Sequence, residues 1–164
     1  MQKAVQFMMA RGCVKSDEFE SLLEQLRPDS TSQLTGEKIL QAVQHINSRL
    51  KKFNMMLRET VDEKTLEKFY VLISTVDNDI SRAASHHNLK ELEYFRLIYS
   101  SLRDGPAEVS SVFGLASQAK LSPSEGRALV NQWVSKHWIA LEGSSLRLGP
   151  RSKAELDVLE AGPS

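Results

Sequence analysis

The sequence has only one cysteine, Cys13, and only four histidines among its 164 residues. A single cysteine excludes a disulfide within the chain. Structural zinc sites usually take four Cys or His ligands in closely spaced pairs, and no such spacing occurs here. The adjacent His86 and His87 lack further ligands at a suitable distance, so we interpret them as exposed loop residues. We therefore expect no zinc or other cofactor to bind to the residues of this chain.

An excess of one charge and a long apolar run are also missing. Lys and Arg together number 21, as do Asp and Glu, so the formal net charge is zero. Dedicated nucleic-acid binders usually carry a basic excess, because neutralisation of phosphates drives their affinity. No apolar run approaches the ~18 residues of a membrane-spanning helix, and the first twelve residues lack the cleavage site of a secretory signal. We expect at most weak DNA binding, no membrane contact and an intracellular protein.

The sequence offers no recognisable catalytic group. The serine pairs 110–111 and 144–145 are not surrounded by the glycines of a nucleophile elbow. Cys13 has no histidine and acid partners in a local motif. It follows the end of a helical pattern among apolar residues, which favours a buried structural thiol. No set of residues therefore supports an enzyme that acts by itself.

The first half of the chain has the pattern of three helices and a β-hairpin. Apolar spacing predicts helices over residues 2–11, from Ser16 to Pro28, and from Thr35 onward. The third helix carries a buried stripe with steps of four and three residues: Ile39, Val43, Ile46, Leu50 and Phe53. β-formers then predict strands over 55–60 and 69–74. This order is typical of a winged helix, a variant of the helix-turn-helix.

The second half repeats this order without repeating the sequence. A helical stretch over 78–86 precedes a helix that Asn88 can cap. A short helix follows over 109–119, and Ser122-Pro123-Ser124-Glu125 is a capping box that begins another. Strands over 138–141 and 146–148 and a closing helix over 152–159 complete the pattern. We predict a mostly α protein with short β-hairpins, an α+β class built from tandem winged-helix domains: domain A at 1–76, a connecting helix at 77–87 and domain B at 88–164.

Several packing motifs resemble a known family. They are the helix Leu129-Val130-Asn131-Gln132-Trp133-Val134, the segment Lys136-His137-Trp138-Ile139, the segment Leu146-Arg147-Leu148-Gly149-Pro150-Arg151, and, upstream, Glu91-Leu92-Glu93-Tyr94-Phe95-Arg96 and 69–74. Together they resemble the non-SMC element 1 family, subunits of the SMC five–six chromosome-maintenance complex. The resemblance covers roughly residues 2–160.

The resemblance implies a nuclear protein-interaction module in DNA repair and recombination. Its partners would be a MAGE-type winged-helix subunit and other subunits of the SMC five–six complex. The family also implies a RING-type ubiquitin ligase whose zinc lies in a C-terminal RING-like domain. The zinc ligands of that domain are absent from this sequence, so the ligase activity is assigned to none of its residues.

Two sets of residues are candidates for contacts. Val5, Met8 and Met9 are candidates for partner binding, because adjacent apolar residues on one helix cannot all face a narrow core stripe and methionine suits adaptable surfaces. For Met8 and Met9, a place in the core is an equally good interpretation. Arg49, Lys51 and Lys52 are candidates for DNA contact, since the third helix of a winged helix usually enters the groove. A solvated helix C-terminus explains them more simply. The alternative function is therefore a winged-helix DNA-binding transcriptional regulator.

Overall fold

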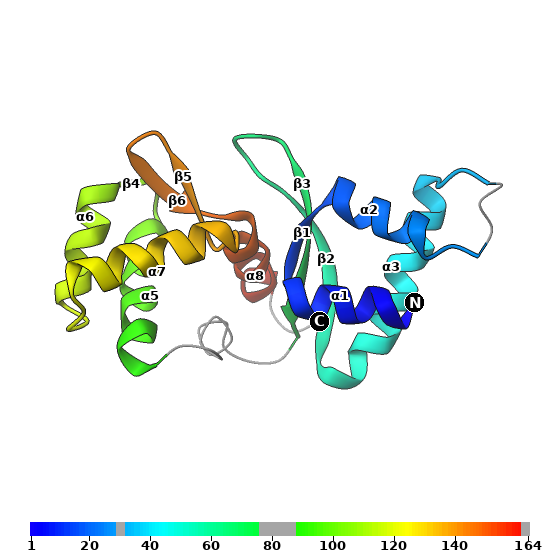
Figure 1. The fold of residues 1–164 in the computed structure, drawn as a ribbon, viewed down its shortest axis with the longest axis horizontal. Coiled ribbons are helices and arrows are strands. Elements are labelled where there is room, and N and C mark those ends of the chain that lie inside the picture. Colours follow the sequence, from blue (N-terminus) through cyan, green and yellow to red (C-terminus); the bar gives the residue numbers. More distant parts are fainter. Residues whose placement is uncertain (29–31, 76–87, 162–164) are drawn as a thin grey trace. The chain divides into compact units, whose positions relative to one another are not determined.

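The computed structural model describes residues 1–28, 32–75 and 88–161, with side chains of the last range described to Glu155 (Figure 1). The described residues divide into two compact units: residues 1–75 together with 157–161, and residues 88–156. The predicted connecting helix at 77–87 and the helical stretch over 78–86 lie outside the described residues.

The first unit contains the elements α1 (Gln2–Arg11), β1 (Cys13–Lys15), α2 (Ser16–Gln25), α3 (Gly36–Leu50), the short 3-10 helix η1 (Lys51–Phe53), β2 (Met55–Val61) and β3 (Lys68–Ser74). Helix α1 ends at Gly12, whose φ of 73° is a left-handed conformation that glycine adopts readily. Helix α3 begins where the Thr35 side chain accepts a hydrogen bond from the Lys38 N–H. These bounds confirm the helix starts that local signals predict.

The sheet of the first unit has three antiparallel strands in the order β1-β3-β2 (Figure 1). Strand β1 pairs with β3 through Cys13 opposite Val71 and Lys15 opposite Phe69. Strand β1 was not predicted from the sequence, because three residues are too few to show the alternation of a strand. This pairing also explains why Cys13 is buried, as predicted for a structural thiol.

The core of the first unit lies between the sheet and its three helices. Its fully buried members include Met8, Phe19, Ile46, Leu50 and Leu57. The predicted stripe on α3 is correct at Ile46 and Leu50 but wrong at Phe53, which is 51% exposed. The reason is that the α-helix changes into η1 at Lys51, and the tighter turn rotates Phe53 away from the stripe.

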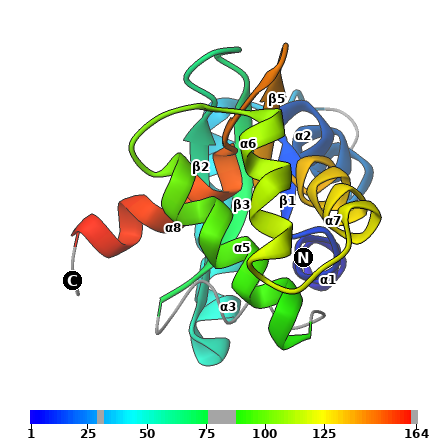
Figure 2. The ribbon, with the colours of Figure 1, turned by 90° about the vertical axis from the view of Figure 1, so that its left-hand side faces the viewer.

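The second unit contains α5 (Leu89–Leu102), β4 (Ala107–Glu108), α6 (Val109–Gly114), the 3-10 helix η2 (Leu115–Ser117), α7 (Pro123–Ser135), β5 (Ile139–Glu142), β6 (Ser145–Leu148) and the part of α8 (Pro150–Ala161) up to residue 156. Capping boxes begin α5, with Asn88 and Glu91, and α7, with Ser122 and Glu125. The sheet order β4-β6-β5 matches that of the first unit, strand for strand. Helix α6 lies beside α7 (Figure 2).

Trp133 is at the centre of the second unit's core. Its ring lies 5.7 Å from that of Tyr94 and 5.0 Å from that of Phe95, measured between centroids. The motif that follows is also structural: a Cβ on Gly149 would lie 2.3 Å from the His137 carbonyl oxygen, and the Arg151 guanidinium stacks 4.2 Å from the Trp138 ring centroid. The buried residues of the motifs that carry the family resemblance, such as Tyr94, Trp133 and Trp138, therefore pack in the core.

The α+β class is confirmed. Each unit has the order helix, strand, helix, helix and β-hairpin, with the first strand of the unit added to the hairpin. This is the order that the winged-helix prediction requires. It places the third helix of the first unit, α3, next to the hairpin β2–β3, and the surfaces of these two elements carry the candidate site.

Candidate functional site

Helix α1 presents less apolar surface than its sequence suggests. Val5 and Met8, predicted to bind a partner, are buried, and both belong to the core of the first unit. Met9 is 49% exposed. The two methionines diverge because successive residues of a helix point about 100° apart. The contact surface predicted on this helix is therefore reduced to Met9.

A partly apolar groove of the first unit lies between α2, α3 and the hairpin β2–β3. It has a volume of about 340 Å³. Its lining residues come from all of these elements: Ser16, Glu20, Gly36, Ile39, Leu40, Val43, Glu59, Lys68 and Tyr70. Leu40, on α3, is 57% exposed at this groove. The groove thus combines an exposed leucine with a partly apolar floor, which suits a side chain of another protein.

Carboxylates dominate the charge of this groove. Among its lining residues, Glu20 and Glu59 are acidic and Lys68 is the basic one. The Lys68 ammonium lies 3.8 Å from Glu59, and Glu20 accepts a hydrogen bond from the Ser16 hydroxyl at 3.1 Å. The lining of this groove therefore carries more negative than positive side chains.

Tyr70 connects the groove to the core. Its ring packs at 4.4 Å from the ring of Phe19, between centroids, and its hydroxyl donates to Glu59 at 3.2 Å. Burial, assisted by the negative charge of Glu59, raises the pKa of Tyr70 to about 12. The phenol stays protonated at neutral pH and holds Glu59 in place at the rim of the groove.

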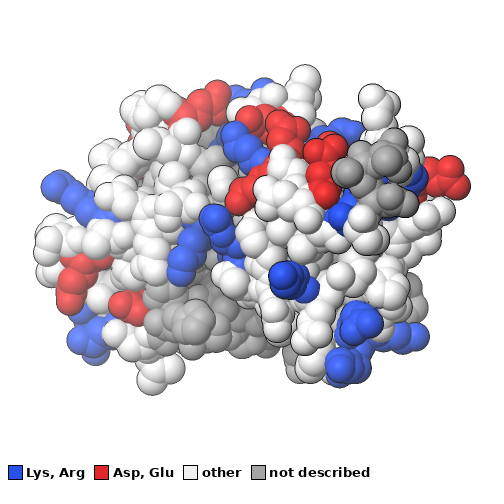
Figure 3. Space-filling model, turned by 45° about the vertical axis from the view of Figure 1, so that its right-hand side comes forward, with Lys and Arg blue, Asp and Glu red and all other residues white. Residues whose placement is uncertain are grey.

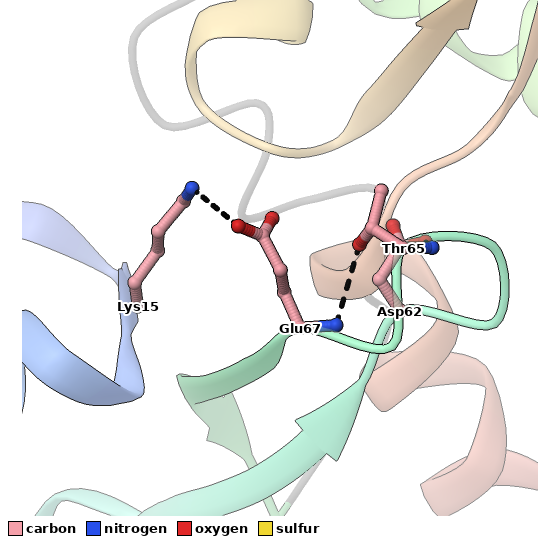
Figure 4. A network of polar contacts seen from close by, with 4 residues as sticks. All are labelled: Lys15, Asp62, Thr65 and Glu67. Atoms are coloured by element: carbon pink, nitrogen blue, oxygen red, sulfur yellow. Dashed lines mark hydrogen bonds and ion pairs between the residues drawn. The ribbon is translucent and has the colours of Figure 1, made fainter.

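The tip of the β2–β3 hairpin is held by hydrogen bonds within the turn and by an ion pair to Lys15 of β1 (Figure 4). One carboxylate oxygen of Asp62 accepts from the backbone N–H groups of Lys64 and Thr65, at 2.9 and 3.1 Å. The Glu67 carboxylate pairs with the Lys15 ammonium at 2.8 Å, and this hydrogen bond raises the pKa of Lys15. The tip holds Leu66 74% exposed with a φ of 60°. An apolar side chain is thus presented on a rigid turn.

The basic residues predicted to contact DNA form a small cluster at the end of α3. Arg49, Lys51 and Lys52 are all exposed. The Arg49 Nε lies 3.4 Å from His45, and the Lys52 ammonium lies 4.9 Å from the Phe53 ring centroid. On the face drawn in Figure 3, Lys and Arg occur singly or in small groups among uncharged and acidic residues. Contact of these three residues with DNA stays a prediction.

The second unit offers a larger but more polar hollow, of about 650 Å³. Its lining includes both acidic cap residues, Glu91 and Glu125, and the exposed Leu89. Over residues 1–28, 32–75 and 88–155, no group of three or more His, Cys, Asp or Glu side chains could hold a metal ion. Nor is any described helix both long enough and apolar enough to cross a membrane.

Sequence reasoning missed the groove residues Leu40, Glu59 and Tyr70. Leu40 lies one residue beyond Ile39 of the predicted stripe and belongs to the outer face of α3, while Glu59 and Tyr70 come from strands further along the chain. A leucine directly after Ile39, outside the predicted buried stripe, is the signal in the sequence that could have pointed to this surface.

Comparison with known proteins gives consistent matches. The model of a family described as "Nse1 non-SMC component of SMC5-6 complex" matches residues 2–112. Proteins named "Non-structural maintenance of chromosomes element 1 homolog" are 26% identical over 163 residues in Xenopus tropicalis and 22% over 162 residues in Bos taurus. Each alignment covers 95% of this chain, which spans 60% of the Xenopus and 61% of the Bos protein. A chain of the solved "Nse1-Nse3-Nse4 complex" has a TM-score of 0.77 and 25% identity, covering 94% of this chain and 70% of that one.

Proposed function

The chain belongs to the family of the Nse1 non-SMC component of the SMC5-6 complex, and from this premise we propose that it is a protein-interaction module of that complex. The observation that carries the proposal is the groove between α2, α3 and the hairpin, where an exposed Leu40 is flanked by Glu20 and Glu59. An apolar centre with a charged rim is the usual anatomy of a protein–protein contact.

The proposed partner is a winged-helix subunit of MAGE type, with further contacts to other SMC5-6 subunits. The solved structure that resembles this chain contains Nse3 and Nse4, which supports such an assembly. The groove fits a partner segment that has an apolar side chain with Lys or Arg nearby, because the carboxylates that line the groove outnumber its one basic side chain. We propose that this interaction module acts in the nucleus, in DNA repair and recombination. A RING-type ubiquitin ligase activity would need paired Cys and His zinc ligands, and the described residues carry none.

Binding of the full chain to an Nse3-type subunit tests the proposal. Leu40→Asp puts a charge in place of an apolar lining residue of the groove, so we expect affinity to fall at least tenfold, about 1.4 kcal/mol. Leu141→Asp is a matched control, because Leu141 is 56% exposed and lies in the second unit, outside the groove. Titration calorimetry measures both. A folded Leu40→Asp chain that binds as tightly as the Leu141→Asp chain would exclude the groove.

A Met9→Asp chain tests the remaining candidate on α1. Met8→Asp is not informative, because Met8 is fully buried and its replacement by a charge would unfold the unit. We expect Met9→Asp to weaken partner binding less than Leu40→Asp does, because Met9 does not line the groove. A larger effect of Met9→Asp would assign the interface to α1.

DNA contact through Arg49, Lys51 and Lys52 is the second candidate function, since these residues are exposed together. Non-specific affinity of ~10⁻⁴–10⁻⁶ M at physiological salt is the most that we expect. Replacing all three by Ala should reduce the slope of log affinity against log salt by about 3, one for each phosphate contact. Tight DNA binding that is lost in this variant would favour the transcriptional regulator instead.

A further inference from the structure

Two cations converge on one hydroxyl group between α2 and α3. The Arg27 guanidinium, which follows α2, donates to the Ser32 Oγ at 2.5 Å and also to the Ser32 carbonyl oxygen. The Lys38 ammonium, in the first turn of α3, donates to the same Oγ at 2.9 Å and to the Gln33 carbonyl oxygen at 3.3 Å. A neutral hydroxyl thus accepts hydrogen bonds from two positive side chains, one before and one after Ser32 in the chain.

This arrangement is better matched to an anion than to an alcohol. A serine hydroxyl has two acceptor positions, and the two cations occupy both. Hydrogen bonds between Arg or Lys and an ionised oxygen are about twice as strong as those to a neutral one. Neither Arg27 nor Lys38 pairs with a carboxylate within the part of the chain that the structure describes. Both side chains direct hydrogen bonds to the Ser32 oxygen.

Ser32 is also accessible to another enzyme. Its side chain is exposed, and it lies in an irregular segment outside helix and strand. A kinase needs to bind its acceptor in an extended form, which such a segment can adopt more easily than a helix. Glutamine follows Ser32 in the sequence, and the chain has one other Ser-Gln pair, Ser117-Gln118.

We propose that Ser32 is a phosphorylation site, and that Arg27 and Lys38 hold the phosphoryl group once it is attached. The donor is ATP bound to a protein kinase that selects serine followed by glutamine. The Ser32 Oγ forms a bond to the γ-phosphorus, the bond from that phosphorus to the β,γ-bridging oxygen breaks, ADP leaves, and the hydroxyl proton passes to a carboxylate of the kinase. The product carries a charge of about −1.5 to −2 opposite the two cations.

Phosphorylation would change the charge of a neighbouring apolar cavity. This cavity, of about 290 Å³, is lined by Met1, Leu23, Leu26, Arg27, Pro28, Leu34, Lys38 and Ala42. Its two charged side chains are the same Arg27 and Lys38 that contact Ser32. A phosphate on Ser32 would neutralise this positive rim and anchor the segment to both α2 and α3, as phosphates do opposite clustered cations.

Ser117 is a matched control within the same chain. It is exposed and is followed by glutamine, as is Ser32. Its hydroxyl, however, donates to the Gly114 carbonyl oxygen at 3.0 Å in the η2 turn, whereas the Ser32 hydroxyl accepts from Arg27 and Lys38. Both serines are thus followed by glutamine, but only the Ser32 hydroxyl accepts hydrogen bonds from Arg27 and Lys38.

The test of the clamp uses the full chain made with phosphoserine at position 32 or, separately, at position 117. Phosphorus NMR follows the second ionisation of each phosphate, which for a free phosphoserine has a pKa of about 6. We expect the pKa at position 32 to be lower by roughly one, the low end of what a cation within about 4–6 Å causes. Arg27→Gln with Lys38→Gln should remove the difference. Equal values at the two positions in the unsubstituted chain would overturn the proposal.

The test of the site itself is phosphorylation of the unmodified full chain. The chain is incubated with ATP and a Ser-Gln-directed kinase, and intact mass and fragment masses locate the phosphate. We expect incorporation at Ser32, and its loss in Ser32→Ala while any incorporation at Ser117 persists. Phosphate at Ser117 alone, or at neither serine, would contradict the proposal. Because no partner subunit is present, neither test depends on the function proposed above.

Discussion

Replacing Trp133 by alanine should remove most of the stability of the second unit. The side chain is 1% exposed, and truncation of a buried tryptophan costs about 3–5 kcal/mol. Two ring contacts, to Tyr94 and Phe95, are lost as well, and each such pair contributes about 0.5–1.5 kcal/mol beyond burial. The loss should therefore lie near the upper end of that range, against a total stability of about 5–15 kcal/mol for a domain.

Urea unfolding followed by tryptophan fluorescence measures this loss. The chain has two tryptophans, so the Trp133→Ala chain retains Trp138 as the one reporter, and Trp138 belongs to the same core. With a urea dependence of about 1–3 kcal/mol/M, a loss of about 4–5 kcal/mol lowers the midpoint by about 2 M. The Trp133→Phe chain, which keeps an aromatic ring at this position, should lose clearly less of its free energy of unfolding. If Trp133→Ala left the midpoint unchanged, the buried position of Trp133 would be wrong.

Three further outcomes are expected. Gly149→Ala should destabilise the second unit by about 1–3 kcal/mol in urea unfolding, since its Cβ would meet the His137 carbonyl oxygen, whereas Gly36→Ala, with open space around it, should not. Burial raises the pKa of Tyr70 and of Tyr94 to about 12, against about 10 in an unfolded chain. The unfolded chain therefore loses these protons first, so the free energy of unfolding should fall as pH rises from about 10 to 12. Tyr70→Phe should reduce this fall, and phenolate absorbance follows the titration. Elemental analysis of the chelator-washed chain should find no stoichiometric zinc, and one tightly held zinc per chain would refute this.

Local signals in the sequence predicted the helices well. The capping box at Ser122 and Glu125 begins α7, and Asn88 caps α5, because a cap depends on residues three positions apart. Strands β1 and β4 were missed because they have three and two residues. They exist through pairing with β3 and β6, which lie far along the chain, and no local pattern encodes such pairing. The resemblance to the non-SMC element 1 family was correct.

The candidate surfaces were harder to predict, because each depends on tertiary geometry. Met8 and Met9 are equally apolar in the sequence, and only the orientation of α1 buries one and exposes the other. The groove at Leu40 takes residues from two helices and two strands. The convergence of Arg27 and Lys38 on Ser32 depends on the path of the chain between two helices. Residue type alone indicated none of these.

The position of β3 at the centre of its sheet has a consequence for how the first unit folds. The hairpin β2–β3 can form from neighbouring residues, but the third strand needs Cys13–Lys15 to reach Phe69–Val71 across almost the whole unit. Closure of such a long loop slows folding, and until it happens one edge of β3 is open to strands of other molecules. A chain lacking residues 1–15 would keep that edge of β3 exposed permanently, so we expect such a chain to aggregate.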